Sequence, residues 1–419
     1  MYKKLLSIFI CLFVILNLSA CSTFSNNSTT QEDNVTIKLS WWGGESRHDN
    51  TIKAIEAFEN AYPNIKVKVE FAEWTGFKKK MNMRIVGNDE PDLMQINYDW
   101  LESYSPDGKG FFDLNKVSDT LGLTNFSSDI LKYGTKNGTL NAIPISMNGK
   151  VIFYNKTLAD KYGLNQFNTW DSLLSSKEKI TDGNYVFELD LLNAWFLGMT
   201  YIYDKNGKDF ITDDVTLGYD QNDIKDLLAF YKSLLDNKII PQPNSIKNYN
   251  LSGNNAVGNI SWASEASKMD SGVKEINSQV TVGPMPSSTG SNPVSYVKPT
   301  MLWAISKNTD HPKEAALLMN FLLNDPAGVN ALGLDRGIPC SKSAINSLQQ
   351  DNQLSGTQYN AITEVNNSKN ILVSPYCENT LIKEICNEAL TEVSYGQSSL
   401  DDIASKTYTN LTQTLDSLK

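Results

Sequence analysis

The chain has 419 residues, of which 41% are hydrophobic and 20% are charged. This balance excludes wholesale disorder and a fibrous repeat, and the length suits a globular chain of two lobes. The formal charge of −10 argues against a surface that neutralises nucleic-acid phosphates. The two histidines, His48 and His311, disfavour a histidine-rich metal site and most histidine-dependent catalytic triads. We therefore expect no metal, no cofactor and no nucleic-acid partner.

The first residues have the pattern of a secretion signal. Two lysines precede an apolar run from Leu5 to Leu16 that is short for a membrane span, which predicts a signal peptide over residues 1–20. The segment Leu18-Ser19-Ala20-Cys21 resembles the lipobox of bacterial lipoproteins. This resemblance implies lipid on Cys21 and a body anchored to the outer face of the cell membrane, with an ordinary signal peptide or a membrane anchor as alternatives. Residues 21–34 then form a flexible tether, because the Ser-, Thr- and Asn-rich stretch buries little apolar surface.

Three cysteines remain in the folded body: Cys340, Cys377 and Cys386. An odd number leaves at least one unpaired. Cys377 and Cys386 fall in what the pattern predicts to be one helix, where nine residues separate them by about 13.5 Å, too far for a bridge. We expect buried thiols, with a disulfide between Cys340 and Cys377 as the alternative. A cysteine nucleophile is not expected, because it needs a nearby base and histidine is scarce.

Strands and helices alternate at the start of the folded body. Alternating apolar residues or short apolar runs predict strands, and helical spacing predicts the helices between them. In chain order the segments are Val35–Trp41, Ile52–Tyr62, Ile65–Phe71, Phe77–Val86 and Leu93–Ile96. This βαβαβ order favours a mostly parallel sheet whose ligand-bearing loops meet at the carboxyl ends of the strands.

Tryptophan follows each of these three strands. The loops carry Trp41-Trp42-Gly43, Glu73-Trp74 and Asn97-Tyr98-Asp99-Trp100. A single tryptophan at such a place would most simply pack in the core. Three at equivalent places predict an aromatic rim, since core residues have no reason to collect at loop tips.

The rest of the chain has fewer clear signals. The pair Asn206-Gly207 predicts a hairpin turn between the strands Tyr201–Tyr203 and Phe210–Ile211. The other predicted elements are the strand Val151–Tyr154, a helix capped by Thr169, the helix Asp220–Asp236, the strands Gly258–Trp262 and Met301–Ile305, and the helix Pro312–Leu323.

Taken together, these segments resemble the family 1 extracellular solute-binding proteins, the maltose-binding-protein-like components of bacterial ABC sugar importers. The resemblance covers nearly the whole mature chain and depends on the order and spacing of weak motifs. The motifs are Trp41-Trp42-Gly43, Phe58 to Ile65, Glu90 to Leu93, Ile143-Pro144, Phe153 to Lys156, Gly258 to Trp262, Trp303 to Ser306 and Gly337-Ile338-Pro339.

The resemblance implies an α/β fold of the type II-like periplasmic-binding-protein class, in which two lobes close around a ligand. The N-terminal lobe would hold residues 35–145 and 298–343, and the C-terminal lobe residues 146–297 and 344–419. Hinge crossings would fall at Pro144–Ser146, Lys298–Leu302 and Cys340–Ala344. Carried over residue by residue, the family's cleft positions are Trp42, Gly43, Glu45, Trp74, Asn97, Asp99, Asn148, Trp195, Trp262 and Arg336, and Trp100 joins them from the aromatic rim.

Aromatic rings beside polar groups suit a carbohydrate. A pyranose has an apolar C–H face that stacks on a ring and a polar rim that bonds amides and carboxylates. Several rings along a cleft favour an oligosaccharide over a monosaccharide. We therefore expect a monomeric binding protein, without catalytic residues, that captures an oligosaccharide. The resemblance implies that it delivers this ligand to the membrane permease subunits of an ABC importer.

A secreted glycoside hydrolase is one alternative function. It would need two acids placed across the scissile bond, and the candidate pairs are Glu188 with Asp190 and Asp213 with Asp214. A binding protein for a polyamine is the other alternative. It would need several acids beside aromatic rings, which Glu45, Glu73 and Asp99 supply in part.

Overall fold

In the computed structural model, residues 34–248, 251–396 and 398–419 are described. Val35–Lys419 forms one unit. The predicted signal peptide, the lipidation site Cys21 and all of the tether except Asn34 lie outside the described residues. Within the described segments, no helix has both the length and the apolar character needed to cross a membrane.

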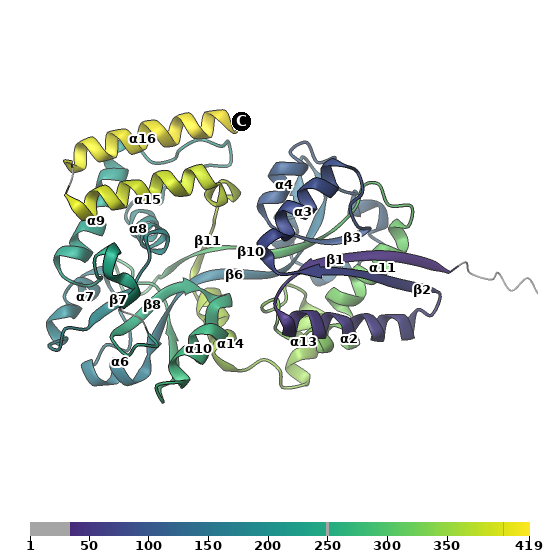
Figure 1. The fold of residues 1–419 in the computed structure, drawn as a ribbon, viewed down its shortest axis with the longest axis horizontal. Helices are drawn as coiled ribbons and strands as arrows, with labels where there is room; N and C mark the ends of the chain where they lie inside the picture. Colours follow the sequence, from purple (N-terminus) through teal and green to yellow (C-terminus); the bar gives the residue numbers. More distant parts are fainter. Residues whose placement is uncertain (1–33, 249–250, 397) are drawn as a thin grey trace, which may run out of the picture. The chain divides into compact units, whose positions relative to one another are not determined.

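The predicted βαβαβ order is confirmed at the start of this unit (Figure 1). Its elements are β1 (Val35–Trp42), α2 (Glu45–Ala61), β2 (Ile65–Ala72), α3 (Trp74–Val86) and β3 (Leu93–Ile96). β1 lies between β2 and β3 and pairs in parallel with both. The carboxyl ends of the three strands therefore meet at one edge of the sheet.

Two long antiparallel strands extend this sheet. The remaining strands of the sheet are β6 (Ala142–Asn155), β7 (Tyr185–Glu188), β8 (Ala256–Trp262), β9 (Val280–Gly283), β10 (Val294–Ile305) and β11 (Lys369–Leu372). The second half of β10 pairs with β3. The first half of β6 pairs with β10, and the second half of β6 pairs with β8 and β9. Through the described residues, one sheet runs in the order β2-β1-β3-β10-β6-β8-β7. The expectation of a mostly parallel sheet is confirmed for the first three strands, whereas the sheet as a whole is mixed.

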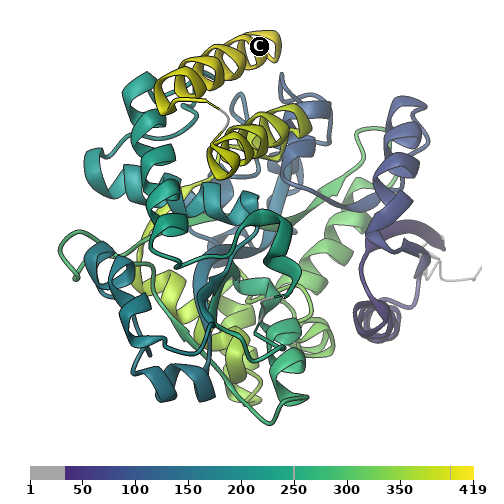
Figure 2. The same cartoon turned by 60° about the vertical axis from the view of Figure 1, so that its left-hand side comes forward.

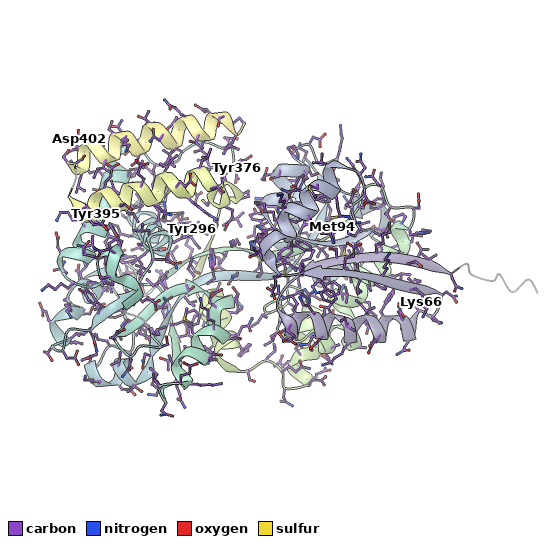
Figure 3. All side chains as sticks on the ribbon, viewed as in Figure 1. Lys66, Met94, Tyr296, Tyr376, Tyr395 and Asp402 are labelled. Carbon is purple, nitrogen blue, oxygen red and sulfur yellow. The ribbon has the colours of Figure 1, made fainter. Side chains whose placement is uncertain are left out.

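Two large hydrophobic cores lie along these strands. Met94 lies in the first core and Tyr296 in the second (Figure 3). β6 gives Ile143 to the first core and Ile152 to the second, and β10 gives Trp303 to the first core. Both long strands therefore pass from one core to the other.

Helices cover both cores. The first core is covered by α2, α11 (Pro312–Asn324) and α12 (Pro326–Leu332), with the short helices α4 (Asp99–Tyr104) and α5 (Ser128–Lys132) nearby. The second core is covered by α6 (Lys156–Tyr162), α7 (Trp170–Leu174), α8 (Leu191–Asn206), α9 (Gln221–Asp236), α15 (Thr380–Tyr395) and α16 (Leu400–Ser417). α15 and α16, in yellow, lie side by side (Figure 2). Smaller apolar clusters involve α10 (Ala266–Lys274), α13 (Lys342–Gln350) and α14 (Gly356–Asn367).

The hairpin predicted at Asn206-Gly207 is wrong. Tyr201–Tyr203 belong to α8, and Gly207 is the residue after that helix, with a left-handed φ of 73°. The positive φ that the pair indicated is therefore present, but it ends a helix. The apolar residues from Leu191 onward support a helix because they pack into the second core, which sequence alone did not reveal.

The prediction that Cys377 and Cys386 share one helix is also wrong. Cys377 lies in a 3-10 turn, Pro375–Glu378, and α15 begins afterwards at Thr380. All three cysteines of the described segments are free. The disulfide between Cys340 and Cys377, which the sequence left undecided, is therefore not formed.

An ion triad ties the long strand β10 to the C-terminal helices. Lys298 of β10 and Lys383 of α15 both bind the carboxylate of Glu378, the second at 2.6 Å. Burial alone would raise the pKa of Glu378, but the two lysines outweigh it and lower that pKa to about 2. The carboxylate therefore stays ionised in the folded protein over nearly the whole acid range.

The first prediction concerns the passage of β6 over α14. A Cβ at Gly149 would lie 2.6 Å from both methyl groups of the buried Val365. Gly149→Ala should therefore lower the free energy of unfolding by about 1–3 kcal/mol, measured by urea unfolding. Gly44→Ala is the matched control, because nothing lies within 4 Å of its Cβ and the change should stay within about 0.5 kcal/mol. Equal stability of the two variants would contradict the close packing.

The second prediction concerns the triad. Because its folded pKa is depressed, Glu378 adds stability that is present above about pH 5 and is lost as the pH falls through about 2. Glu378→Gln should lower the free energy of unfolding by about 3 kcal/mol at neutral pH, and the difference should shrink as the pH is lowered. Asp160→Asn, which breaks the exposed pair of Asp160 with Lys156, should cost less than about 0.5 kcal/mol. A difference for Glu378→Gln that does not change with pH would contradict the role of the ionised triad.

Candidate functional site

Trp42, Trp74 and Phe77 form an aromatic wall at the carboxyl ends of β1 and β2. The ring centroids of Trp42 and Trp74 lie 5.0 Å apart, and Phe77 lies 5.5 Å from Trp42. Gly76, with φ 88°, breaks the helical geometry of α3 directly after the turn that carries Trp74. Trp42 is buried, whereas Trp74 is 41% exposed. The wall therefore presents one open indole on a packed aromatic support.

Trp100 and Trp195 are buried. Trp100 is 0% exposed and packs against Trp42 at 6.1 Å and against Phe77 at 6.4 Å. Trp195 is 2% exposed and meets Phe210 edge-on in the second core. The structure brings Trp100 to the aromatic wall as a supporting ring, and it places Trp195 away from the wall.

Asn97 and Asp99 lie together at the carboxyl end of β3. Asn97 Nδ2 donates to Asp99 Oδ1 over 2.6 Å, and Lys78 of α3 forms an ion pair with Asp99 at 3.0 Å. The Asp99 side chain is largely buried. Its charge is therefore already paired in this conformation.

Gly43 and Glu45 lie where β1 gives way to α2. A Cβ at Gly43 would lie 2.5 Å from Cδ of Arg47, so the glycine lets this arginine fold back over the loop. Arg47 donates to the backbone carbonyls of Trp42 and Asp335 over 3.1 and 2.7 Å. Glu45 is exposed at the start of α2.

Asn148 joins β6 to the loop that follows β8. Its Nδ2 donates to Ser264 Oγ over 2.9 Å, and its Oδ1 accepts from the Ser264 backbone N–H over 3.1 Å. Both halves of the amide are therefore engaged. This contact holds the chain immediately after Trp262 against the long strand.

Trp262, at the end of β8, is partly buried and lies beside two lysines. The ammonium of Lys150 is 4.1 Å from the centroid of its ring, and that of Lys298 is 4.6 Å away. Phe196 of α8 packs edge-on against the same indole. A ligand that reaches this ring therefore meets two cationic side chains.

Arg336 is held inside the molecule. Its Nε donates to Gln95 Oε1 and its Nη2 to Thr51 Oγ1, each over 2.9 Å, and its guanidinium lies over Trp303 at 5.3 Å. Burial lowers the pKa of Arg336, and Arg47 lowers it further. This arginine positions β3 and α2 against the segment that follows α12.

A polar cavity of about 440 Å³ lies beside these arginines. Ser46, Arg47 and Asn50 of α2 line one part, and Ser264 lines another. Asp335 spans the α2 part, because it accepts from Ser46 over 3.1 Å and from Asn50 over 2.5 Å. Since Ser264 also bonds Asn148, the cavity lies next to the elements that carry Trp262.

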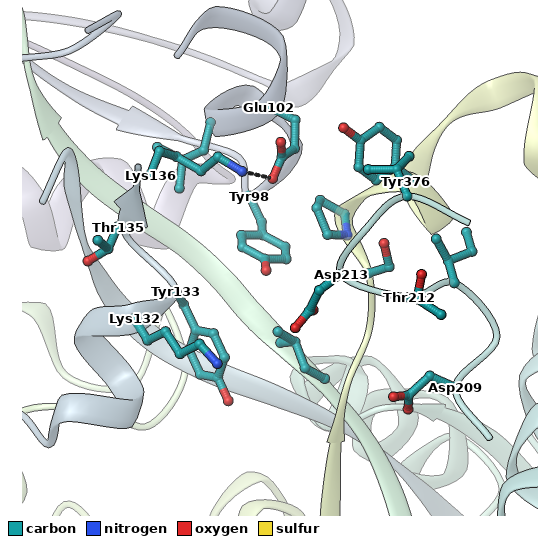
Figure 4. A pocket seen from close by; sticks show the side chains of 16 residues that line it. Tyr98, Glu102, Lys132, Tyr133, Thr135, Lys136, Asp209, Thr212, Asp213 and Tyr376 are labelled. Carbon is teal, nitrogen blue, oxygen red and sulfur yellow. Dashed lines mark hydrogen bonds and ion pairs between the residues drawn. The ribbon is translucent and has the colours of Figure 1, made fainter. Parts of the chain in front are cut away.

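A second cavity, of about 330 Å³, lies between elements of both cores (Figure 4). Tyr98 and Glu102 line it from the first core, and Asp209, Asp213 and Tyr376 line it from segments next to the second core. Burial raises the pKa of Tyr98. Burial also raises the pKa of Asp209, with a smaller contribution from Asp213. None of the eleven predicted ligand-binding residues lines this cavity, although one acid of the alternative hydrolase pairs does.

Sequence reasoning missed the basic residues of this region. Arg47, Lys150 and Lys298 lie next to predicted residues in space but carry no motif. The sequence did contain one signal for Lys150. This lysine directly precedes the apolar run Val151–Tyr154 and lies two residues before the buried Ile152, on the same face of the strand. A charged residue on the buried face of a strand is rare unless it has a partner or a role.

Residues 53–355 match the family described as bacterial extracellular solute-binding protein. The melibiose/raffinose/stachyose-binding protein of Bacillus subtilis (strain 168) is 27% identical over 193 residues, which are 46% of this chain and 42% of that protein. The alignment thus spans about two fifths of that curated relative.

Solved structures extend the match over almost the whole chain. A periplasmic solute binding protein from Pectobacterium atrosepticum SCRI1043 is 33% identical, with a TM-score of 0.84, over 92% of this chain and 99% of that one. A periplasmic oligogalacturonide binding protein from Yersinia enterocolitica, in complex with saturated digalacturonic acid, is 30% identical, with a TM-score of 0.80 and the same coverage. The chain therefore belongs to the bacterial extracellular solute-binding protein family and has its two-lobe α/β fold.

Proposed function

We propose that this protein captures an oligosaccharide in the cleft between its lobes and delivers it to an ABC importer. The observation that carries the proposal is the half-exposed indole of Trp74 on the aromatic wall, because a partly open ring on a rigid support is what stacks on the apolar face of a pyranose. Trp262 supplies a second ring from the other lobe.

We base the lobe division on the two large hydrophobic cores, which support it. We assign residues 35–145 and 298–343 to the N-terminal lobe and residues 146–297 and 344–419 to the C-terminal lobe. The crossings at Pro144–Ser146 and Lys298–Leu302 then fall within β6 and β10, between the parts that serve each core. Closure would bring Trp74 and Trp262 toward one ligand, and the ligand would favour the closed state by its higher affinity for it.

The named ligands of the relatives support a carbohydrate with more than one sugar unit. The Bacillus subtilis relative is named for melibiose, raffinose and stachyose, and the Yersinia enterocolitica relative for oligogalacturonide. Within the site we assign direct ligand contacts to Trp42, Gly43, Glu45, Trp74, Asn97, Asp99, Asn148 and Trp262. We assign a positioning role to Trp100, Trp195 and Arg336, because Trp100 packs behind Trp42, Trp195 packs in the second core, and Arg336 bonds Gln95 and Thr51.

The exported, lipid-anchored state belongs to the same proposal. A lipid on Cys21 and a tether up to Asn34 would hold a monomer near the permease at the outer face of the membrane. The family of extracellular solute-binding proteins supports the extracytoplasmic location.

Catalysis fits this molecule less well. Asp190 caps α8 by accepting from the Asn193 backbone N–H over 2.7 Å, and Glu188 accepts from the Leu251 backbone N–H. Both carboxylates thus hold backbone in place. Burial raises the pKa of the Cys340 and Cys377 thiols to about 12, which disfavours a thiolate nucleophile.

A polyamine also fits less well. Of the three acids that could attract it, Asp99 is paired with Lys78 and Glu45 is exposed outside the aromatic wall. Lys150 and Lys298 beside Trp262 would repel a cation that approached the ring.

The third prediction tests the aromatic wall. A thermal-shift screen against neutral and acidic di- to pentasaccharides should find a stabilising ligand, because binding to the folded state alone raises its apparent stability. Trp74→Ala should weaken calorimetric binding of the best ligand on the order of tenfold to a hundredfold, since one stacked ring and its buried area are lost.

Tyr395→Ala is the matched control, because Tyr395 is an exposed aromatic residue on α15, outside the wall. It should leave the affinity unchanged. Tighter binding of a free hexose than of every longer sugar would reject the oligosaccharide assignment. Recovery of fragments instead of intact sugar after incubation would favour the hydrolase.

A further inference from the structure

Lys150 is a buried cation without a carboxylate of its own. Its side chain is 2% exposed, it forms no ion pair among the described residues, and its ammonium donates to Asn193 Oδ1. Asp190 acts on it through that amide, because Asn193 Nδ2 donates to Asp190 Oδ2 over 2.9 Å. A buried ammonium is costly unless a negative group compensates it.

The sheet register places Lys150 on the same face of the sheet as Asn148, Trp262 and Lys298. In the pairing of β6 with β10, Lys298 lies opposite Asn148, and in the pairing of β6 with β8, Lys150 lies opposite Trp262. Side chains two apart along a strand, and those directly opposite on its neighbours, share a face. The two lysines, the amide and the indole therefore form a single patch across three strands, which we call the lysine–tryptophan patch (Asn148, Lys150, Trp262 and Lys298).

The charges around the patch do not cancel. Lys298 shares Glu378 with Lys383, so two ammonium groups divide one carboxylate. The charged groups that face Lys150 are Asp190 at the start of α8, Lys298 on β10, Glu378 in the 3-10 turn and Glu265 near the start of α10. Glu265 is itself paired with Lys268. An excess of positive charge thus remains around a partly open indole.

We propose that the lysine–tryptophan patch is an acidic-sugar subsite, in which the carboxylate of a uronic acid binds Lys150 and Lys298 while its pyranose ring contacts Trp262. This inference rests on the proposed function, because it needs the ligand to reach Trp262. It goes further by naming the class of sugar: a hexuronate-containing oligosaccharide. The carboxylate would supply the negative charge that the protein does not provide to Lys150.

The subsite has a consequence for pH. Burial lowers the pKa of Lys150 to about 7, with Asp190 opposing this shift. Above about pH 7 the free protein increasingly holds a neutral amine, so binding of a carboxylate requires uptake of a proton. The affinity for an acidic sugar should therefore fall by up to about tenfold per pH unit above that value, whereas the affinity for a neutral sugar should not.

Calorimetry with matched sugars tests the proposal. The probes are α-1,4-digalacturonate, β-1,4-diglucuronate and β-1,4-dimannuronate, each beside the neutral disaccharide obtained by reducing its carboxyl groups. At pH 6 we expect at least one acid to bind at least tenfold more tightly than its neutral counterpart. Lys150→Met and Lys298→Met should each remove most of that preference, and Lys150→Met should also remove the pH dependence.

Controls separate binding from folding. Thermal unfolding of each variant identifies any that is misfolded. Lys150→Gln keeps a polar group near Asn193 and should lose the preference for the acidic sugar as Lys150→Met does. Lys116→Met removes a lysine that also lies over an aromatic ring, Phe112 at 5.9 Å, outside the patch, and should change nothing.

The outcomes distinguish the two proposals. If neutral sugars bind as well as their acids at every pH, or if the lysine variants keep the preference, the acidic-sugar subsite is rejected and the carbohydrate function stands. If neither these probes nor any sugar of the wider screen binds, both proposals fall.

Discussion

The structure depends on the backbone pairing of β6 with β10. One half of each strand packs in the first core and the other half packs in the second core. The same hydrogen-bonded ladder is therefore shared by both lobes. Because the strands are long and continuous, the lobes cannot separate without breaking this ladder. The pairing also fixes the register of the residues near the crossing, including Asn148 opposite Lys298.

This arrangement also decides which residues meet at the site. The carboxyl ends of β1, β2 and β3 deliver Trp42, Trp74 and Asp99 to one edge, as expected for parallel neighbours. Trp262 arrives from another direction, at the end of β8, and its neighbours are set by the antiparallel pairing of β8 with β6. The aromatic wall and the lysine–tryptophan patch thus come from two different parts of one sheet, and each rests on its own hydrophobic core.

Sequence periodicity predicted the local elements of the first lobe because a half-buried strand and an amphipathic helix have distinct repeats. The strands predicted at Val35–Trp41 and Ile65–Phe71 are each one residue longer in the structure. It failed at Tyr201–Tyr203, where a helix that is buried on most sides lacks a polar face to reveal its period. It predicted that tryptophans collect after the strands, but burial of Trp100 behind Trp42 is a matter of tertiary packing that spacing does not contain. Lys150 is the sharper case. Its place in an apolar strand was visible, whereas its neighbours came from β8, β10 and α8, which no local pattern brings together.

The sign of the charge at the lysine–tryptophan patch differs from that of the whole chain, and the reason is distance. A formal charge of −10 spread over the surface is screened within about 8–10 Å at physiological ionic strength, so it decides solubility and weak long-range repulsion. Lys150 and Lys298 lie about 4 to 5 Å from the indole of Trp262, where screening by solvent is weak and the charges nearest to the ring decide the local field. An acidic chain with this basic patch would then repel anions over most of its surface and retain one only where a sugar ring can lie against Trp262. Selectivity of this kind comes from placement of a few charges within the fold, and net charge carries no information about it.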